Sequence, residues 1–224
     1  MSATTSATTV ARPNIHEMVV VHKVFRRELR LLPMLVGRIA DGDTVRAGRI
    51  AGHARMVLAG LHMHHTGEDE VLWPLLSERA APSAEVVRRM EADHERVDQL
   101  DAVLDPQLTR WAATADPAAR AELTATLTEL RDIVLRHLDD EEREILPLAE
   151  QYLSVAEWDS MGEHGRDAMS ARELPLLFGA IVEDATPEEQ AMMLAPLPAP
   201  VRLLLRTVGA WRYRRYISAV RETG

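Results

Sequence analysis

Two copies of one histidine–glutamate pattern stand out in this chain of 224 residues. His64 precedes Glu68 by four residues, and His137 precedes Glu141 by the same interval, 73 positions further along. On an α-helix, residues four apart lie on one face, offset by about 40° and roughly 6 Å along the axis. Each pair can therefore reach a single metal ion.

A second pair of histidines extends the repeat. His22 and His94 stand 72 positions apart, so the chain contains the pattern His … His-x3-Glu twice. Two such units facing each other would form a two-metal site inside a helical bundle. The predicted metal ligands are His22, His64, Glu68, His94, His137 and Glu141.

The types of residue available as ligands limit which metal the site can bind. The chain contains no cysteine, which excludes iron–sulfur clusters, thiolate haem, zinc ribbons and disulfides. Imidazole with carboxylate suits iron, manganese or zinc. The His-Glu-x-x-His motif of zinc proteases is missing, and the Glu-x-x-His spacing of ferritin-type bundles occurs only once, from Glu91 to His94.

The remaining histidines have other expected places. His65 lies about 100° around the helix from His64 and should point to a neighbouring helix or to the rim of the site. His53 shares a face with His64 but lies roughly 16 Å away along the helix, so it is interpreted as a core or helix-end residue. His62 should lie off the ligand face, and His16 and His164 at the surface. Solvated or ligand-orienting roles are expected for Asp69, Asp139, Asp140 and Glu142.

Apolar residues recur with helical periodicity, and no alternating strand pattern occurs. Asp105-Pro106 should end the third helix and leave Trp111 in a looser stretch. Asp116-Pro117 should start the fourth. Pro74 and Pro147 each follow a ligand glutamate by six residues and should kink or end their helices. The expected helices cover about 14–40, 44–77, 84–104 and 117–152.

Long helices with short connections predict an all-α fold, an antiparallel four-helix bundle with a helical C-terminal extension. The expected organisation is a mobile N-terminal tail over 1–13, the bundle over 14–152, and the extension over 153–224, packed on the bundle. Ser154 with Glu157 and Thr186 with Glu189 are expected helix caps in the extension.

The composition of the chain limits the kinds of partner that we expect it to bind. Apolar residues make up 46% of the chain, as in a globular protein, and the net charge of −9 argues against nucleic acid. No apolar stretch approaches the ~20 residues of a membrane span, and no signal peptide is apparent. We therefore expect no membrane partner and a cytoplasmic location.

The last segment, residues 201–221, is apolar and basic together. Six arginines are interleaved with Trp211, Tyr213 and Tyr216. Such a segment could bind an acidic partner or anionic lipid, but a packed helix with a charged outer face is the preferred interpretation.

The ordered ligands resemble the hemerythrin-like family, also called the HHE cation-binding domain, over residues 14–152. The acidic runs EDEVLWP (68–74) and EEREILP (141–147) are similar to that family as well. The resemblance implies two iron ions between four helices, bridged by Glu68 and Glu141 and by an oxo or hydroxo group. The terminal ligands would be His22, His64, His94 and His137. The long extension resembles that of actinobacterial members.

One departure from the family bears on activity. Oxygen-carrying hemerythrins have five histidine ligands, two of them on the third helix, whereas His94 is alone here. The resemblance then implies an open di-iron centre that binds and turns over hydrogen peroxide or nitric oxide, as a peroxidase- or catalase-like enzyme with an unidentified electron donor. The alternatives are a sensor of oxygen, iron or redox state and a carrier of oxygen or iron without turnover.

Overall fold

A computed structural model of the protein describes residues 11–80, 84–167 and 174–222. Within these ranges the regular structure is helical, without a strand. The predicted all-α class is confirmed. Most of the predicted N-terminal tail, residues 1–10, lies outside the described residues.

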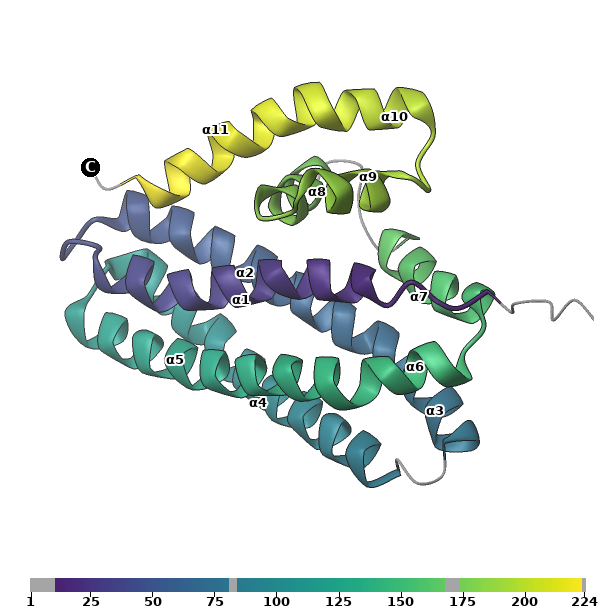
Figure 1. Cartoon of the computed structure of the whole chain (residues 1–224). Helices are drawn as coiled ribbons and strands as arrows, with labels where there is room; N and C mark the ends of the chain where they lie inside the picture. Colours follow the sequence, from purple (N-terminus) through teal and green to yellow (C-terminus); the bar gives the residue numbers. More distant parts are fainter. Residues whose placement is uncertain (1–10, 81–83, 168–173, 223–224) are drawn as a thin grey trace, which may run out of the picture.

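Four long helices form the body of the molecule. α1 packs along α2 and α5, and α4 packs along the same two helices. The chain turns back between α1 and α2 and between α4 and α5 (Figure 1). The four are α1 (His16–Gly37), α2 (Thr44–Gly67), α4 (Ala84–Thr114) and α5 (Pro117–Asp140).

Two of these helices continue through a π-helical turn. α2 leads through η1 (Glu68–Leu72) into α3 (Trp73–Arg79), and α5 leads through η3 (Glu141–Ile145) into α6 (Leu146–Tyr152). The second and fourth predicted helices therefore exist, each as three joined segments.

The ends of the first helix differ from the prediction. α1 starts at His16, two residues after Asn14, whose carbonyl accepts the Glu17 N–H at 3.2 Å. It stops at Gly37, before the turn around Gly42, which has a φ of 78°. Asp43 then caps α2 by accepting the Arg46 N–H.

The third helix is longer than predicted. α4 passes through Pro106 and includes Trp111, so the predicted end at Asp105-Pro106 was wrong. Leu108 and Trp111, which lie beyond Pro106, are completely buried. Burying each such side chain contributes about 1.5–3 kcal/mol, which together matches or exceeds the roughly 3 kcal/mol that an internal proline costs. The predicted start of α5 is confirmed, with Asp116 capping the N–H groups of Ala118 and Ala119.

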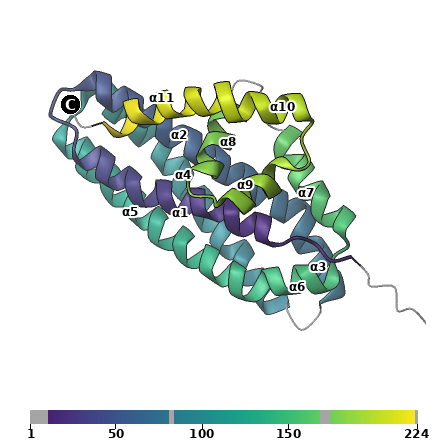
Figure 2. The same ribbon diagram turned by 45° about the horizontal axis from the view of Figure 1, so that its top comes forward.

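The C-terminal extension is helical and lies over one side of the bundle (Figure 2). α8 contacts α1, α11 contacts α8 and α2, and α7 contacts α2 and η1. Both predicted caps, Ser154 with Glu157 and Thr186 with Glu189, are confirmed. The extension consists of α7 (Val155–Asp167), α8 (Leu174–Glu183), α9 (Pro187–Leu194), α10 (Ala199–Leu204), η4 (Leu205–Gly209) and α11 (Ala210–Arg221).

One glycine sets the distance between two helices of the extension. A Cβ on Gly179 in α8 would lie 2.3 Å from Cβ of Tyr213 in α11. Only a residue without a side chain lets these helices approach so closely.

Candidate metal centre

A polar layer divides the apolar core of the bundle. One apolar cluster includes Phe25 and Val134, and the other includes Met18 and Leu72. Burial of the two clusters aligns the helices, so the polar residues between them must face one another. The layer consists of His22, His64, His65, Glu68, His94, His137 and Glu141.

Each glutamate of the layer is the first residue of a π turn. The N–H of Trp73 donates to the carbonyl of Glu68, and the N–H of Leu146 donates to that of Glu141, five residues back in each case. The next residue is a proline, which has no N–H. The interruption predicted at Pro74 is thus a π turn, a feature that recurs at functional sites.

Two groups of nitrogen and oxygen atoms that could bind a metal lie within the layer. Within each group, one donor atom of every residue lies within 4.8 Å of the others. All six predicted ligands fall into these groups, and their role as ligands stays a prediction. The first group is His22, His64, Glu68 and Glu141; the second is His65, His94 and His137.

The carboxylate of Glu68 lies between the two groups. Its Oε1 is 3.2 Å from Nε2 of His64, and its Oε2 is 3.4 Å from Nε2 of His94. In the first group, Oε2 of Glu141 lies 3.2 Å from Nε2 of His22. Glu68 therefore has one oxygen directed at each group.

The residue that follows each glutamate of the layer, Asp69 or Glu142, forms a hydrogen bond with a histidine of the layer. Nδ1 of His94 lies 2.7 Å from Asp69, and Nδ1 of His22 lies 2.8 Å from Glu142. An imidazole that donates Nδ1–H to a carboxylate presents Nε2 as its free donor atom. Asp69 and Glu142 thus have the orienting geometry expected of them, whereas Asp139 pairs with Arg26 and Asp140 with Arg143.

A third carboxylate beside the layer was not predicted. Oδ2 of Asp93 lies 3.8 Å from Nδ1 of His137, beyond hydrogen-bond distance, and the polar interaction with this histidine lowers the pKa of Asp93. Asp93 directly precedes His94 in the sequence, but it faces a histidine on another helix. Only the packing of α4 against α5 reveals this contact.

His65 was expected to point to a neighbouring helix or to the rim of the site, and it lies against His94 of α4, within the layer. Its side chain is buried, and its ring stacks on that of His94 with centroids 3.9 Å apart and an interplanar angle of 9°. The layer therefore contains five histidines, the fifth from the second long helix rather than the third. The predicted ligand set contained four histidines and left His65 out, and the adjacent His64-His65 pair was the available signal.

A bound metal ion would balance the charges of the layer better than protonation of its histidines and glutamates does. Burial disfavours the charged form of His22, but the Glu141 carboxylate outweighs this and raises its pKa to about 9. Burial and the charge on His22 lower the pKa of His64 to about 3. Burial and the neighbouring Glu141 raise the pKa of Glu68. A divalent cation instead binds neutral imidazole and ionised carboxylate together.

Unpartnered polar atoms support this fit. A buried polar atom without a hydrogen bond costs about 1–3 kcal/mol. Nitrogens that share a metal such as zinc lie at most about 4.2 Å apart, and Nε2 of His94 lies 3.2 Å from Nε2 of His137. The layer atoms without a hydrogen bond are His22 Nε2, His64 Nε2, both ring nitrogens of His65, both carboxylate oxygens of Glu68 and Glu141, and His137 Nδ1.

The other histidines lie away from the layer. His53 is buried between Glu28 and Tyr216, as a core residue. His62 is largely exposed, and the half-exposed side chain of His16 bonds to Glu189. The side chain of His164 lies outside the described part of the chain.

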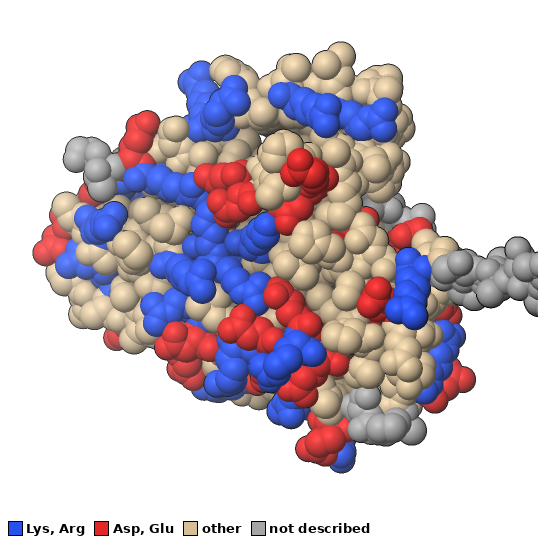
Figure 3. All heavy atoms as spheres, viewed as in Figure 1, with Lys and Arg blue, Asp and Glu red and all other residues tan. Residues whose placement is uncertain are grey.

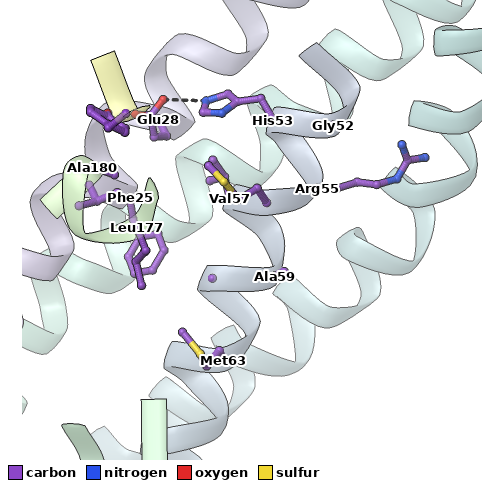
Figure 4. A pocket seen from close by; sticks show the side chains of 14 residues that line it. Phe25, Glu28, Gly52, His53, Arg55, Val57, Ala59, Met63, Leu177 and Ala180 are labelled. Atoms are coloured by element: carbon purple, nitrogen blue, oxygen red, sulfur yellow. Dashed lines mark hydrogen bonds and ion pairs between the residues drawn. The ribbon is translucent and has the colours of Figure 1, made fainter. Parts of the chain in front are cut away.

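A cavity of about 470 Å³ adjoins the first donor group, between α1, α2 and the extension. Phe25 lines the cavity, and its ring centroid lies 5.1 Å from that of His64. Figure 4 shows Phe25 and Leu177 on one side, Met63 on α2, and Arg55 pointing away. The rest of the lining is largely apolar, with Glu28 and His53 at one end; it also includes Val24, Gly52, Met56, Val57, Ala59, Gly60, Ala180 and Tyr213.

The hemerythrin HHE cation-binding domain family matches residues 14–149 of this chain. The chain belongs to that family, whose domain binds cations, and its two donor groups are of a kind that could hold a metal ion. No curated protein and no solved structure matches the chain. The match ends before the extension, so it says nothing of α7 to α11.

Proposed function

We propose that this protein holds two iron ions and that the centre binds and turns over a small oxidant, hydrogen peroxide or nitric oxide. The observation that carries the proposal is the position of Glu68, which directs one carboxylate oxygen at each donor group. A single carboxylate placed in this way can bridge two metals. Family membership favours iron as the cation.

The donor groups suggest unequal roles. His65, His94 and His137 would hold one metal through three nitrogens, and His22 and His64 would hold the other through two. The second of these sites, with fewer nitrogen donors, is where an oxidant would bind. Iron would supply redox equivalents and Lewis acidity.

The residues of the chain would orient the metal ligands and provide a route to the metal site. Asp69 and Glu142 fix the imidazoles of His94 and His22, and Glu142 is held in turn by Arg26. Phe25 lines the cavity and also contacts His64 of the first donor group, so the cavity lies next to the metal site that has two histidines. Its apolar lining admits small neutral molecules such as nitric oxide or peroxide and disfavours ions.

Reversible oxygen binding without turnover is the second candidate, and the fifth histidine, His65, favours it. Turnover is preferred because of the cavity. Exclusion of water protects a reactive adduct, yet Gly52 and Ala59 in the cavity lining are exposed to solvent. An accessible cavity favours exchange of substrate and product over storage.

The test is oxidant consumption by the iron-loaded protein. Peroxide and nitric oxide would each be followed with a chemical reductant present, per pair of irons. Many turnovers would support the enzyme. Fewer than about two turnovers, with one stoichiometric spectral change, would place the protein among carriers or sensors.

A second test addresses the cavity. Gly60→Leu would fill the space beside Phe25, since a Cβ at Gly60 lies 3.9 Å from its ring. We expect unchanged iron content and at least tenfold slower consumption. Gly48→Leu is the matched control, because Gly48 is exposed and a Cβ added there would meet no atom within 4 Å. Equal rates in both variants would exclude the cavity as the route.

The role of His65 is tested by metal content. His65→Ala should lower the iron bound from two per chain to about one, because it removes a nitrogen from the second group. His62→Ala, three residues away with a largely exposed side chain, should leave the iron content unchanged. Two irons retained in His65→Ala would remove His65 from the ligand set.

A further inference from the structure

The last helix of the protein has an exposed apolar stripe. α10, η4 and α11 follow one another without a break over residues 199–221. Among the described residues, the exposed large hydrophobic side chains outside this helix are scattered: Met34, Val45 and Val103. Within this helix, a stretch of nine residues carries four more: Leu203 (65% exposed), Leu204 (54%), Val208 (49%) and Trp211 (54%).

The opposite side of the same helix anchors it to the molecule. Leu205, Tyr213, Ile217 and Val220 are buried. Tyr213, Ile217 and Val220 belong to the core of the bundle. The apolar stripe is therefore presented by a fixed helix and is not needed for its packing.

Arginines border the stripe. Residues 199–221 contain six arginines and no acidic residue, in a chain whose net charge is −9. Arg221 turns inward to Glu28 and Glu183, and Arg215 lies over the Trp211 ring at 5.9 Å. The five arginines without an ion pair to any described acidic residue are Arg202, Arg206, Arg212, Arg214 and Arg215.

The shape of this region suits a flat partner. The helix forms the outermost edge of the molecule in both ribbon views (Figures 1 and 2). Over this helix, the face in Figure 3 shows blue and tan atoms without red ones. A helix that protrudes in this way can lie on a planar surface.

We propose that residues 203–215 bind the surface of an anionic lipid membrane, with the helix lying flat. A helix of this kind inserts Leu and Trp side chains at the headgroup boundary while its arginines contact anionic lipids. No helix among the described residues is long and apolar enough to cross a membrane. A second copy of the chain would bring like charges together, which disfavours pairing through this face.

Trp211 provides a direct readout of binding. The other tryptophans, Trp73, Trp111 and Trp158, are at most 4% exposed, so a change in emission on binding reports Trp211. Full-length, metal-loaded protein would be mixed with vesicles of phosphatidylglycerol and phosphatidylcholine, or of phosphatidylcholine alone. We expect co-sedimentation and a blue shift with the anionic vesicles, weakening as salt is added.

Matched variants separate the stripe and the arginines from general effects. Val208→Glu should lower vesicle affinity at least tenfold, whereas Val45→Glu, on a valine of α2 that is even more exposed, should not. R212Q/R214Q/R215Q should weaken binding roughly a hundredfold, since each arginine near an anionic surface contributes about a factor of five. R38Q/R88Q/R110Q removes the same charge elsewhere and is the control.

Three outcomes would overturn the proposal. One is the absence of binding to anionic vesicles at low salt, and another is an equal effect of Val208→Glu and Val45→Glu. The third is binding of polyglutamate, by the same arginines, without any binding of vesicles. That result would identify an acidic protein as the partner of this face.

Discussion

Two buried clusters of histidine, glutamate and their neighbours lie within the same bundle, and they differ in how completely they are paired. In the metal layer, Glu68 and Glu141 have no hydrogen bond to either carboxylate oxygen. In the second cluster, Glu28 accepts from Arg27 and Arg221 at 2.8 Å and lies 3.1 Å from His53.

The second cluster joins the bundle to the extension. His53 also contacts the Tyr216 hydroxyl at 2.9 Å, and Arg221 donates to Glu183 at 2.6 Å. Except for Nε of Arg221, every buried polar side-chain atom of these residues has a partner. The cluster satisfies itself with protein groups alone, so it needs no ligand and acts as a structural clamp.

The comparison shows that buried histidine and glutamate can serve either a ligand site, as in the layer, or the structure alone, as in the clamp. Buried polar groups are normally hydrogen-bonded, so a buried histidine or glutamate is not by itself a sign of a ligand site. The unpartnered atoms that converge in the layer are that sign. The same distinction predicts opposite responses to mutation.

The largest expected effect is loss of the metal. Glu68→Ala should release iron and lower the stability of the metal-loaded protein by on the order of 5–10 kcal/mol, a fall in melting temperature above about 10 °C. In metal-free protein the same change should be neutral or stabilising, because it removes a buried carboxylate beside Glu141. His16→Ala is the control and should change neither iron content nor melting temperature.

Removal of the clamp should have a smaller effect that does not depend on metal. Glu28→Ala leaves Arg27, Arg221 and His53 without their carboxylate, which typically costs about 3–5 kcal/mol. The melting temperature should fall equally in metal-loaded and metal-free protein, with iron content unchanged. Loss of iron in this variant would show that the two clusters are not independent.

The clamp also predicts a dependence on pH. Burial alone would raise the pKa of Glu28, but its bonds to His53 and Arg27 outweigh burial and lower it to about 2. Because the folded pKa lies below the unfolded value of about 4.5, the stabilisation is present above pH 4.5 and is lost as pH falls toward 2. It amounts to about 3 kcal/mol.

This pH effect is measured as a difference. Denaturation of the wild type and of Glu28→Gln would be compared from pH 7 to 2, with bound iron determined at each pH. The gap in stability between the two proteins should narrow below pH 4.5. A constant gap would mean that Glu28 has no lowered pKa.

The smallest effect concerns the contact of α8 with α11. Gly179→Ala places a Cβ 2.3 Å from Tyr213, which bonds to Glu183 in the clamp region. Such overpacking costs about 1–3 kcal/mol. Gly48→Ala, with open space around it, should gain up to about 1 kcal/mol from helix propensity. Thermal melts of both variants at equal iron content give the comparison.

The local features were predictable because helix geometry is local. Four residues of separation place His64 and Glu68 on one face whatever the helix packs against, and the structure brings both into one donor group. Asp116 and Thr186 act as caps through bonds to residues two or three positions away. The all-α class follows from the same short-range pattern.

Other features depended on burial. The course of α4 through Pro106 was decided by the buried side chains beyond it, and proline chemistry alone predicted the opposite. The sequence likewise favoured a packed last helix with a charged outer face, and the structure buries Tyr213 and Ile217 of that helix. The apolar stripe that stays exposed beside the arginines was not predicted.

The sequence alone determined the helical class, the repeated ligand pattern and most of the caps, since each depends on residues within about one turn of one another. Only the tertiary structure decided that His65 joins the layer, that Asp93 faces His137, and that Glu28 and His53 need no metal. Those outcomes depend on which side chains from distant helices meet in the core, and no spacing within one helix specifies them.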